Sequence, residues 1–172
     1  HERFIKVLYL YAFLLSTTLM FASSEKTTLS IGSAAPSVFA LDHNGDPIDL
    51  GAALSEKLSL VFFYPKAHTP GCTQQACSLR DAFSLLQEKG VQVFGVSSDS
   101  PKAQKSFRDK HALPYTLISD KRSLVAHAFG KSRWSRHAYL FNRGVLIWKD
   151  TKGATASQGE EAIAALKSLE LY

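Results

Sequence analysis

The amino-acid sequence predicts one α/β domain, a layered sandwich in which helices flank a central mixed β-sheet. Two observations support this prediction. Apolar runs typical of strands buried on both faces alternate with segments of helical period through the middle of the chain. The chain has 172 residues, of which 45% are hydrophobic and 20% charged, so it is long enough to bury a core and has the composition of a globular protein.

The predicted strands are bounded by residues that favour turns. Residues 30–50 are expected to form short strands around a turn at Asn44 and Gly45, which suit a tight hairpin. Residues 58–65 are a continuous apolar run rich in Val and Phe, as in a strand buried on both faces. Further strands are expected at residues 91–98 and 115–120, and in a hairpin over residues 137–150 with its turn at 142–144.

The predicted helices follow from a change of period and from cap residues. After Cys72, apolar residues recur every three or four positions until Gly90 ends the pattern; they are Ala76, Leu79, Phe83 and Leu86. Ser100 is a typical N-cap and Pro101 a typical first helical residue. Shorter segments with helical character are residues 123–130 and, as the closing helix, 159–171.

The first 24 residues differ in composition from the rest of the chain. Arg3 and Lys6 precede a mostly apolar run, residues 7–22, after which small and polar residues follow, as in a secretory signal peptide. The run is interrupted by hydroxyl residues and is shorter than the roughly 20 apolar residues of a typical spanning helix. We therefore expect residues 1–24 to be a signal peptide or N-terminal membrane anchor and residues 25–172 to be the folded domain. The protein would then be exported, periplasmic or membrane-anchored; the alternative is a cytoplasmic protein with an extra helix.

The charge balance favours no nucleic-acid partner. The formal net charge is +5, a modest excess for which nucleic-acid binding would also require a clustered basic patch. The best candidate cluster, GKSRWSRH, is small and carries Lys131, Arg133 and Arg136 around the single aromatic residue Trp134. We expect Lys131 and Arg133 to be solvated.

The two cysteines of the chain, Cys72 and Cys77, lie five positions apart. A structural disulfide is the simplest explanation in an exported chain, but so short a loop constrains little chain entropy. Cys72 follows a buried strand and opens a helix, where free backbone N–H groups and the helix dipole stabilise an anion and hence the nucleophilic thiolate. Chemistry is therefore the favoured explanation, and a buried, inert cysteine in an ordinary loop is the alternative.

The residues around Cys72 resemble a known signature. Pro65, Thr69 and Cys72 match the P-x-x-x-T-x-x-C motif of the peroxiredoxins. The segment TPGCTQQAC is similar to the bacterioferritin-comigratory or Q-type subfamily, with Cys77 in the resolving position. The resemblance extends over about residues 30–171.

Two further positions bear on this resemblance. RHAYLFNRGV places Arg136 where the family keeps its active-site arginine. The chain departs from many members at Gln75, where they carry glutamate, so that a neutral amide replaces a carboxylate in the hydrogen-bond network. This departure bears on the tuning of Cys72 and leaves its role unchanged.

The resemblance implies a thioredoxin-like fold and a thiol peroxidase that needs no metal or organic cofactor. Cys72 would attack a hydroperoxide and become a sulfenic acid, with Thr69 bonding the peroxide oxygens, Arg136 stabilising the negative charge and Pro65 shielding the sulfur. Cys77 would then form an intramolecular disulfide, which thioredoxin or another dithiol donor would reduce. The subfamily resemblance also implies a monomer.

Helix geometry adds a condition to this scheme. Residues five apart on an intact helix have Cα atoms about 8.5 Å apart, whereas a disulfide seldom spans more than about 7 Å. If Cys72 and Cys77 pair, the first turns of the helix must unwind in each cycle.

Two other functions remain open. An exported thiol-disulfide oxidoreductase works through C-x-x-C, and the C-x-x-x-x-C spacing of this chain disfavours it. A copper-binding protein of the same fold would use both thiolates and a histidine, for which His68 is the nearest candidate, but copper binding gives no reason for Thr69 or Arg136. Zinc is not expected with so few thiols.

Overall fold

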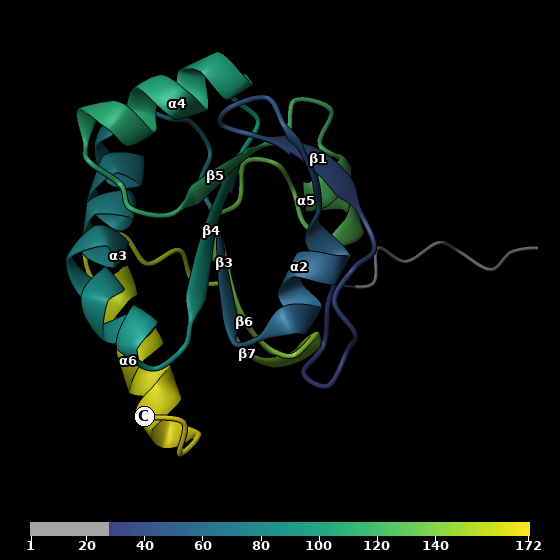
Figure 1. Cartoon of the computed structure of the whole chain (residues 1–172), viewed down its shortest axis with the longest axis vertical. Coiled ribbons are helices and arrows are strands. Elements are labelled where there is room, and N and C mark those ends of the chain that lie inside the picture. The colour runs from purple at the N-terminus through teal and green to yellow at the C-terminus, as the bar shows by residue number, and fades with distance from the viewer. Residues whose placement is uncertain (1–27) are drawn as a thin grey trace, which may run out of the picture.

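The computed structural model describes residues 28–172 (Figure 1). The elements along the chain are β1 (Phe39–Asp42), β2 (Pro47–Asp49), α2 (Leu50–Glu56), β3 (Ser59–Phe63), α3 (Pro70–Glu88), β4 (Gln92–Ser97), α4 (Pro101–Lys110), β5 (Thr116–Ser119), α5 (Leu124–Ala128), β6 (His137–Asn142), β7 (Val145–Asp150) and α6 (Gln158–Ser168). The expected leader at residues 1–24 lies outside the described residues. Within residues 28–172, no helix is both long enough and apolar enough to cross a bilayer.

The strands form one seven-stranded mixed sheet in the order β2-β1-β5-β4-β3-β6-β7. The central strands β3, β4 and β5 are parallel, whereas β1, β2, β6 and β7 are joined to the sheet by antiparallel pairs. The buried central strand β3 lies between β4 and β6, which explains why its sequence is apolar on both faces. The predicted mixed sheet is confirmed.

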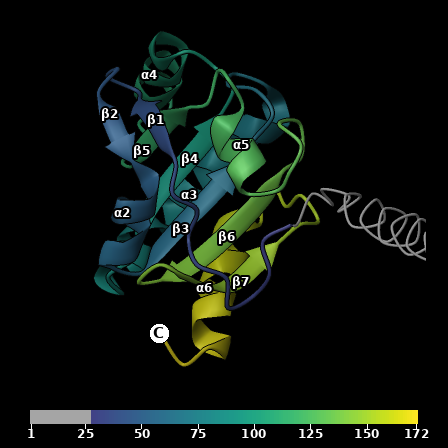
Figure 2. The same cartoon turned by 90° about the vertical axis from the view of Figure 1, so that its right-hand side faces the viewer.

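Helices cover both faces of this sheet. Figures 1 and 2 show α3 and α6 side by side on one face, with α4 beyond them, and α2 and α5 on the other. Alternate residues of β3 point to opposite layers: Leu60 and Phe62 pack in the core that includes Leu79 of α3, and Val61 and Phe63 pack in the core that includes Leu50 of α2. The two cores confirm the predicted sandwich.

Only strands were predicted between residues 30 and 50, and the helix α2 that follows them was not predicted. Asp49 caps this helix by accepting a hydrogen bond from the Ala52 N–H, and Leu50 and Leu54 bury one face of it. The N-cap followed by two leucines four positions apart was the available signal. With only seven residues, the helix shows too little periodicity to stand out.

Candidate active site

Cys72 lies in the first turn of α3, the helix that follows the loop after β3. Its side chain is buried, with 1% of its surface exposed, and its thiol is free. Pro70 is the first helical residue, and its fixed φ suits the start of a helix. The unpaired backbone N–H groups of this first turn are available to an anion beside the sulfur.

Arg136 is the charged group that contacts the cysteine. Its Nη2 lies 3.5 Å from Cys72 Sγ. The sheet brings these distant residues together, because Phe63 at the end of β3 pairs with His137 at the start of β6, and Arg136 directly precedes that pair. Gly71 leaves room for the guanidinium, since an added Cβ there would lie 3.3 Å from Nη2.

Thr69 occupies the N-cap position of α3 but does not cap the helix with its side chain. Its hydroxyl donates instead to the Lys66 carbonyl oxygen at 2.7 Å, which closes the loop between β3 and α3. The backbone carbonyl of Thr69 accepts from both the N–H and the hydroxyl of Thr73. Pro65 is half-buried at the start of this loop, directly after Tyr64, whose N–H donates to Val96.

Gln75 is fully buried and links Arg136 to the last helix. Its Oε1 accepts a hydrogen bond from Arg136 Nη1 at 2.7 Å, and its Nε2 donates to Gln158 Oε1 in α6 at 2.9 Å. The neutral amide noted in the sequence is therefore a direct partner of the arginine. Gln158 was not predicted as a site residue, because nothing in the sequence pattern of α6 distinguishes this amide from a solvent-facing one.

Cys77 is half-buried on the same helix and is also a free thiol. Both cysteines lie within the continuous helix α3, so the helix places their Cα atoms about 8.5 Å apart, beyond the usual span of a disulfide. The structure therefore holds Cys72 beside Arg136 and leaves Cys77 outside that contact.

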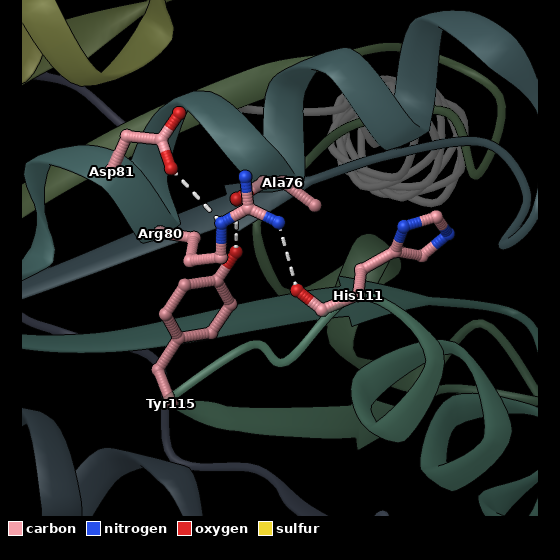
Figure 3. Close-up of polar contacts among 5 residues, drawn as sticks. All are labelled: Ala76, Arg80, Asp81, His111 and Tyr115. Atoms are coloured by element: carbon pink, nitrogen blue, oxygen red, sulfur yellow. Dashed lines mark hydrogen bonds and ion pairs between the residues drawn. The ribbon is translucent and has the colours of Figure 1, made fainter.

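The helix on either side of Cys77 is held by two neighbouring segments (Figure 3). The Tyr115 hydroxyl donates to the Ala76 carbonyl oxygen at 2.6 Å, and burial raises the pKa of Tyr115 well above its usual value, so it keeps this proton. Arg80 Nη1 donates to the His111 carbonyl oxygen at 2.9 Å, while its Nε pairs with Asp81. These bonds tie α3 to the end of α4 and to the loop before β5.

One expectation about the basic cluster is wrong. Arg133 is exposed and stacks on Trp134, but Lys131 is only 5% exposed. The Lys131 amine lies 4.3 Å from the centre of the Phe63 ring and donates to the Ser132 carbonyl oxygen. Burial lowers the pKa of Lys131 to about 8. The aromatic ring and the carbonyl oxygen replace water around the amine, which the sequence could not reveal.

His68, considered above as a copper ligand, adopts a left-handed backbone with φ of 64°. Its ring packs edge-on against Phe107, with ring centres 5.2 Å apart, and lies 6.4 Å from the ring of His111. The imidazole thus contacts α4 residues and the C-cap of that helix. Within residues 28–172, no group of three or more His, Cys, Asp or Glu side chains is placed to hold a metal ion.

Residues 31–149 match the family model described as the AhpC/TSA family. The chain is 36% identical over 126 residues to peroxiredoxin bcp1 of Schizosaccharomyces pombe, which covers 70% of this chain and 65% of that protein. It is 39% identical over 112 residues to peroxiredoxin Bcp of Escherichia coli K12, which covers 65% of this chain and 70% of that protein. The chain spans about two thirds of the length of these relatives.

The fold also resembles solved structures. Peroxidoxin BcpB of Mycobacterium tuberculosis superposes with a TM-score of 0.75 at 26% identity, over 82% of this chain and 98% of that chain. This similarity confirms the predicted thioredoxin-like fold.

Proposed function

The chain belongs to the AhpC/TSA family of peroxiredoxins, in its Bcp/PrxQ subfamily, and from this premise we propose that it is a thiol peroxidase whose reactive group is Cys72. Its substrates are hydrogen peroxide and organic hydroperoxides. The observation that supports this most is the contact between a buried cysteine sulfur at a helix start and the Arg136 guanidinium, 3.5 Å away. An arginine in this place favours the thiolate and meets the charge that develops in the reaction.

In the first step, the Cys72 thiolate attacks the terminal peroxide oxygen. The O–O bond breaks, and the leaving oxygen departs with the electron pair and takes up a proton as water or an alcohol. The sulfur is oxidised to a sulfenic acid. Arg136 stabilises the negative charge on the leaving oxygen. Because the Thr69 hydroxyl donates its hydrogen bond to the Lys66 carbonyl oxygen, its lone pairs are free to accept a hydrogen bond from the peroxide O–H.

In the second step, Cys77 attacks the Cys72 sulfenic sulfur. A disulfide forms and water leaves, which accounts for both sulfurs and the oxygen. The first turns of α3 must unwind for the two sulfurs to meet, because the intact helix holds their Cα atoms too far apart. The missing side-chain cap at Thr69 favours opening from this end.

A dithiol donor then restores both thiols by exchange. Thioredoxin or a protein of similar chemistry is the proposed reductant, and the protein acts as a monomer without metal or organic cofactor. Residues 1–24 are proposed to direct export or membrane attachment. The reductant would then be periplasmic or supplied through the membrane, since cytosolic thioredoxin would be out of reach.

The test is hydroperoxide oxidation of the purified protein, followed by intact mass and thiol counting. We expect the wild type to lose both thiols and about 2 Da, C77S to stop at a sulfenic acid about 16 Da heavier, and C72S to stay inert. If peroxide leaves both thiols intact while a protein disulfide oxidises them or copper binds them readily, the peroxidase proposal is wrong. The protein would then be an oxidoreductase or a copper-binding protein.

A further inference from the structure

A buried pair of amides connects the last helix to the active-site arginine. Gln75 of α3 and Gln158 of α6 are both 0% exposed. Arg136 Nη1 donates to Gln75 Oε1, and Gln75 Nε2 donates to Gln158 Oε1. The chain of bonds therefore runs from α6 through α3 to the guanidinium that contacts Cys72.

The direction of these bonds follows from the chemistry of the groups. A guanidinium has only donors, so Gln75 must turn its oxygen toward Arg136. Its NH₂ group then faces α6, where Gln158 must offer an oxygen in turn. The remaining NH₂ group of Gln158 is buried and has no hydrogen-bond partner among the described residues. The last member of the chain thus leaves a donor unsatisfied while it supplies the acceptor that Gln75 needs.

We propose that Gln158 is a positioning residue for the peroxidase reaction. This inference rests on the proposed function and adds to it a residue outside the cysteine motif. The oxygen of Gln158 fixes the orientation of the Gln75 amide, which holds Arg136 against the Cys72 sulfur. Without that acceptor the buried NH₂ group of Gln75 loses its partner, so the Gln75 amide is no longer fixed in place and holds Arg136 less firmly against the sulfur.

A second contact joins the start of α6 to α3. Gly159, next to Gln158, donates its N–H to Ser78 Oγ of α3 at 2.8 Å. A Cβ at Gly159 would collide with the Ser78 carbonyl oxygen, so only glycine lets the two helices approach this closely. The Ser78 contact belongs to the same helix pair but does not lead to Arg136. It therefore provides a matched control.

The neutral pair also bears on the charge of the site. No carboxylate forms an ion pair with Arg136 within the described part of the chain. Two amides orient the guanidinium without neutralising it, so its positive charge remains directed at the sulfur and the leaving oxygen. Replacement of the pair by a carboxylate would hold Arg136 equally well but would offset that charge.

The test compares Q158M with S78A in the full chain. Q158M keeps the length of the side chain but removes the acceptor, and we expect about a tenfold loss in the rate of Cys72 oxidation by hydrogen peroxide. S78A should be oxidised at the wild-type rate, even if its melting temperature falls as far as that of Q158M. Q158E restores an acceptor oxygen but adds a negative charge near the guanidinium, so it should recover only part of the lost rate. In the double variant Q75M/Q158M, the second substitution should add nothing to the loss caused by Q75M.

A second readout separates this inference from the proposed function. The rate of Cys72 alkylation by iodoacetamide, measured from pH 5 to 9, reports on the thiolate whether or not peroxide is the substrate. We expect the pH–rate profile of Q158M to move to higher pH and that of S78A to match the wild type. Wild-type oxidation and alkylation rates in Q158M, or equal losses in Q158M and S78A, would overturn the positioning role. A wild type that ignores peroxide while Q158M still shifts the alkylation profile would overturn the peroxidase proposal alone.

Discussion

The two parts of helix α3 are held in different ways. The N-terminal segment, residues 70–75, carries Cys72 and is tied to the rest of the molecule mainly through polar side chains, Arg136 and Gln158. The anchored segment, residues 76–88, begins one residue before Cys77. It buries Ala76, Leu79 and Leu86 in the core, and it accepts from Tyr115 and donates to the end of α4.

The two segments of α3 therefore differ in what stabilises them. A buried leucine side chain contributes about 1.5 to 3 kcal/mol, whereas a typical hydrogen bond contributes about 0.5 to 1.5 kcal/mol net. The anchored segment is therefore the more stable of the two. The contacts that hold the N-terminal segment are the same contacts that assemble the reactive site. Under the proposed mechanism, we therefore expect oxidation of Cys72 to weaken the part of the helix that has to open for a disulfide with Cys77.

The largest expected effect comes from breaking the anchored segment. L79A removes a fully buried side chain and leaves a cavity, so the free energy of unfolding should fall by about 2 to 5 kcal/mol. Chemical denaturation measures this loss, and the rate of Cys72 oxidation should stay within about threefold of wild type. Q74A, at an exposed position of the N-terminal segment, is the control and should change the unfolding free energy by less than about 0.5 kcal/mol.

Arg136 tests the N-terminal segment. R136M removes the charge beside Cys72 Sγ and should slow Cys72 oxidation by about 100-fold in a stopped-flow measurement. The free energy of unfolding should fall by about 1 to 3 kcal/mol, because the buried Gln75 oxygen loses its donor. R133M removes an exposed arginine from the same loop and should leave the rate unchanged. If R133M slowed Cys72 oxidation as much as R136M does, the positive charge of the loop would matter and not the contact of Arg136 with the sulfur.

Tyr115 tests the boundary between the two segments. Y115F keeps the ring but removes the donor to the Ala76 carbonyl, at a cost of about 1 kcal/mol. Hydrogen exchange of the amides near Ala76 and Arg80 should be about fivefold faster in the reduced protein. Y139F, which removes a hydroxyl in the other core, should leave exchange in α3 unaffected. Unchanged hydrogen exchange in Y115F would show that the Tyr115 bond does not set the boundary between the two segments of α3.

The smallest expected effect is a pH dependence at the end of α4. Burial lowers the pKa of His111 from 6.5, and the nearby charges of Lys110, His68 and Arg80 lower it further. As the pH falls through 6.5, the unfolded chain therefore binds a proton before the folded protein does, and stability decreases.

The decrease should be visible in the unfolding free energy measured between pH 7 and 5. His43 and His137, whose pKa values burial also lowers, contribute to the wild-type slope, so H111Q should reduce it and not abolish it. H127Q, at an exposed position, is the control. A slope in H111Q as steep as in wild type would exclude His111 as a contributor.

The sequence predicted features that depend on local pattern. The apolar run of β3 and the helical period after Cys72 placed the cysteine at a helix start, and the motif indicated Thr69 and Pro65. Arg136 was found only through its resemblance to a family position. The physical reason for its place is the pairing of Phe63 with His137, a contact between strands far apart in the chain.

Features that depend on packing between distant elements were not predicted. Gln158 reaches Gln75 because α6 packs on α3 at Gly159. No periodicity in the sequence of α6 indicates that this amide faces inward. Lys131 was expected to be solvated because it lies in a polar segment, yet the ring of Phe63 covers its amine. In both cases, the environment of a polar side chain is set by another element of the fold.

The most direct test of the account is hydrogen exchange of α3 in the reduced protein and in the protein oxidised by one equivalent of hydrogen peroxide. We expect the oxidised form to lose amide protection over residues 70–77, while the amides of residues 80–88 keep the protection that they have in the reduced form. Equal protection of residues 70–77 in both forms would contradict the claim that this part of the helix opens for Cys77 to reach Cys72.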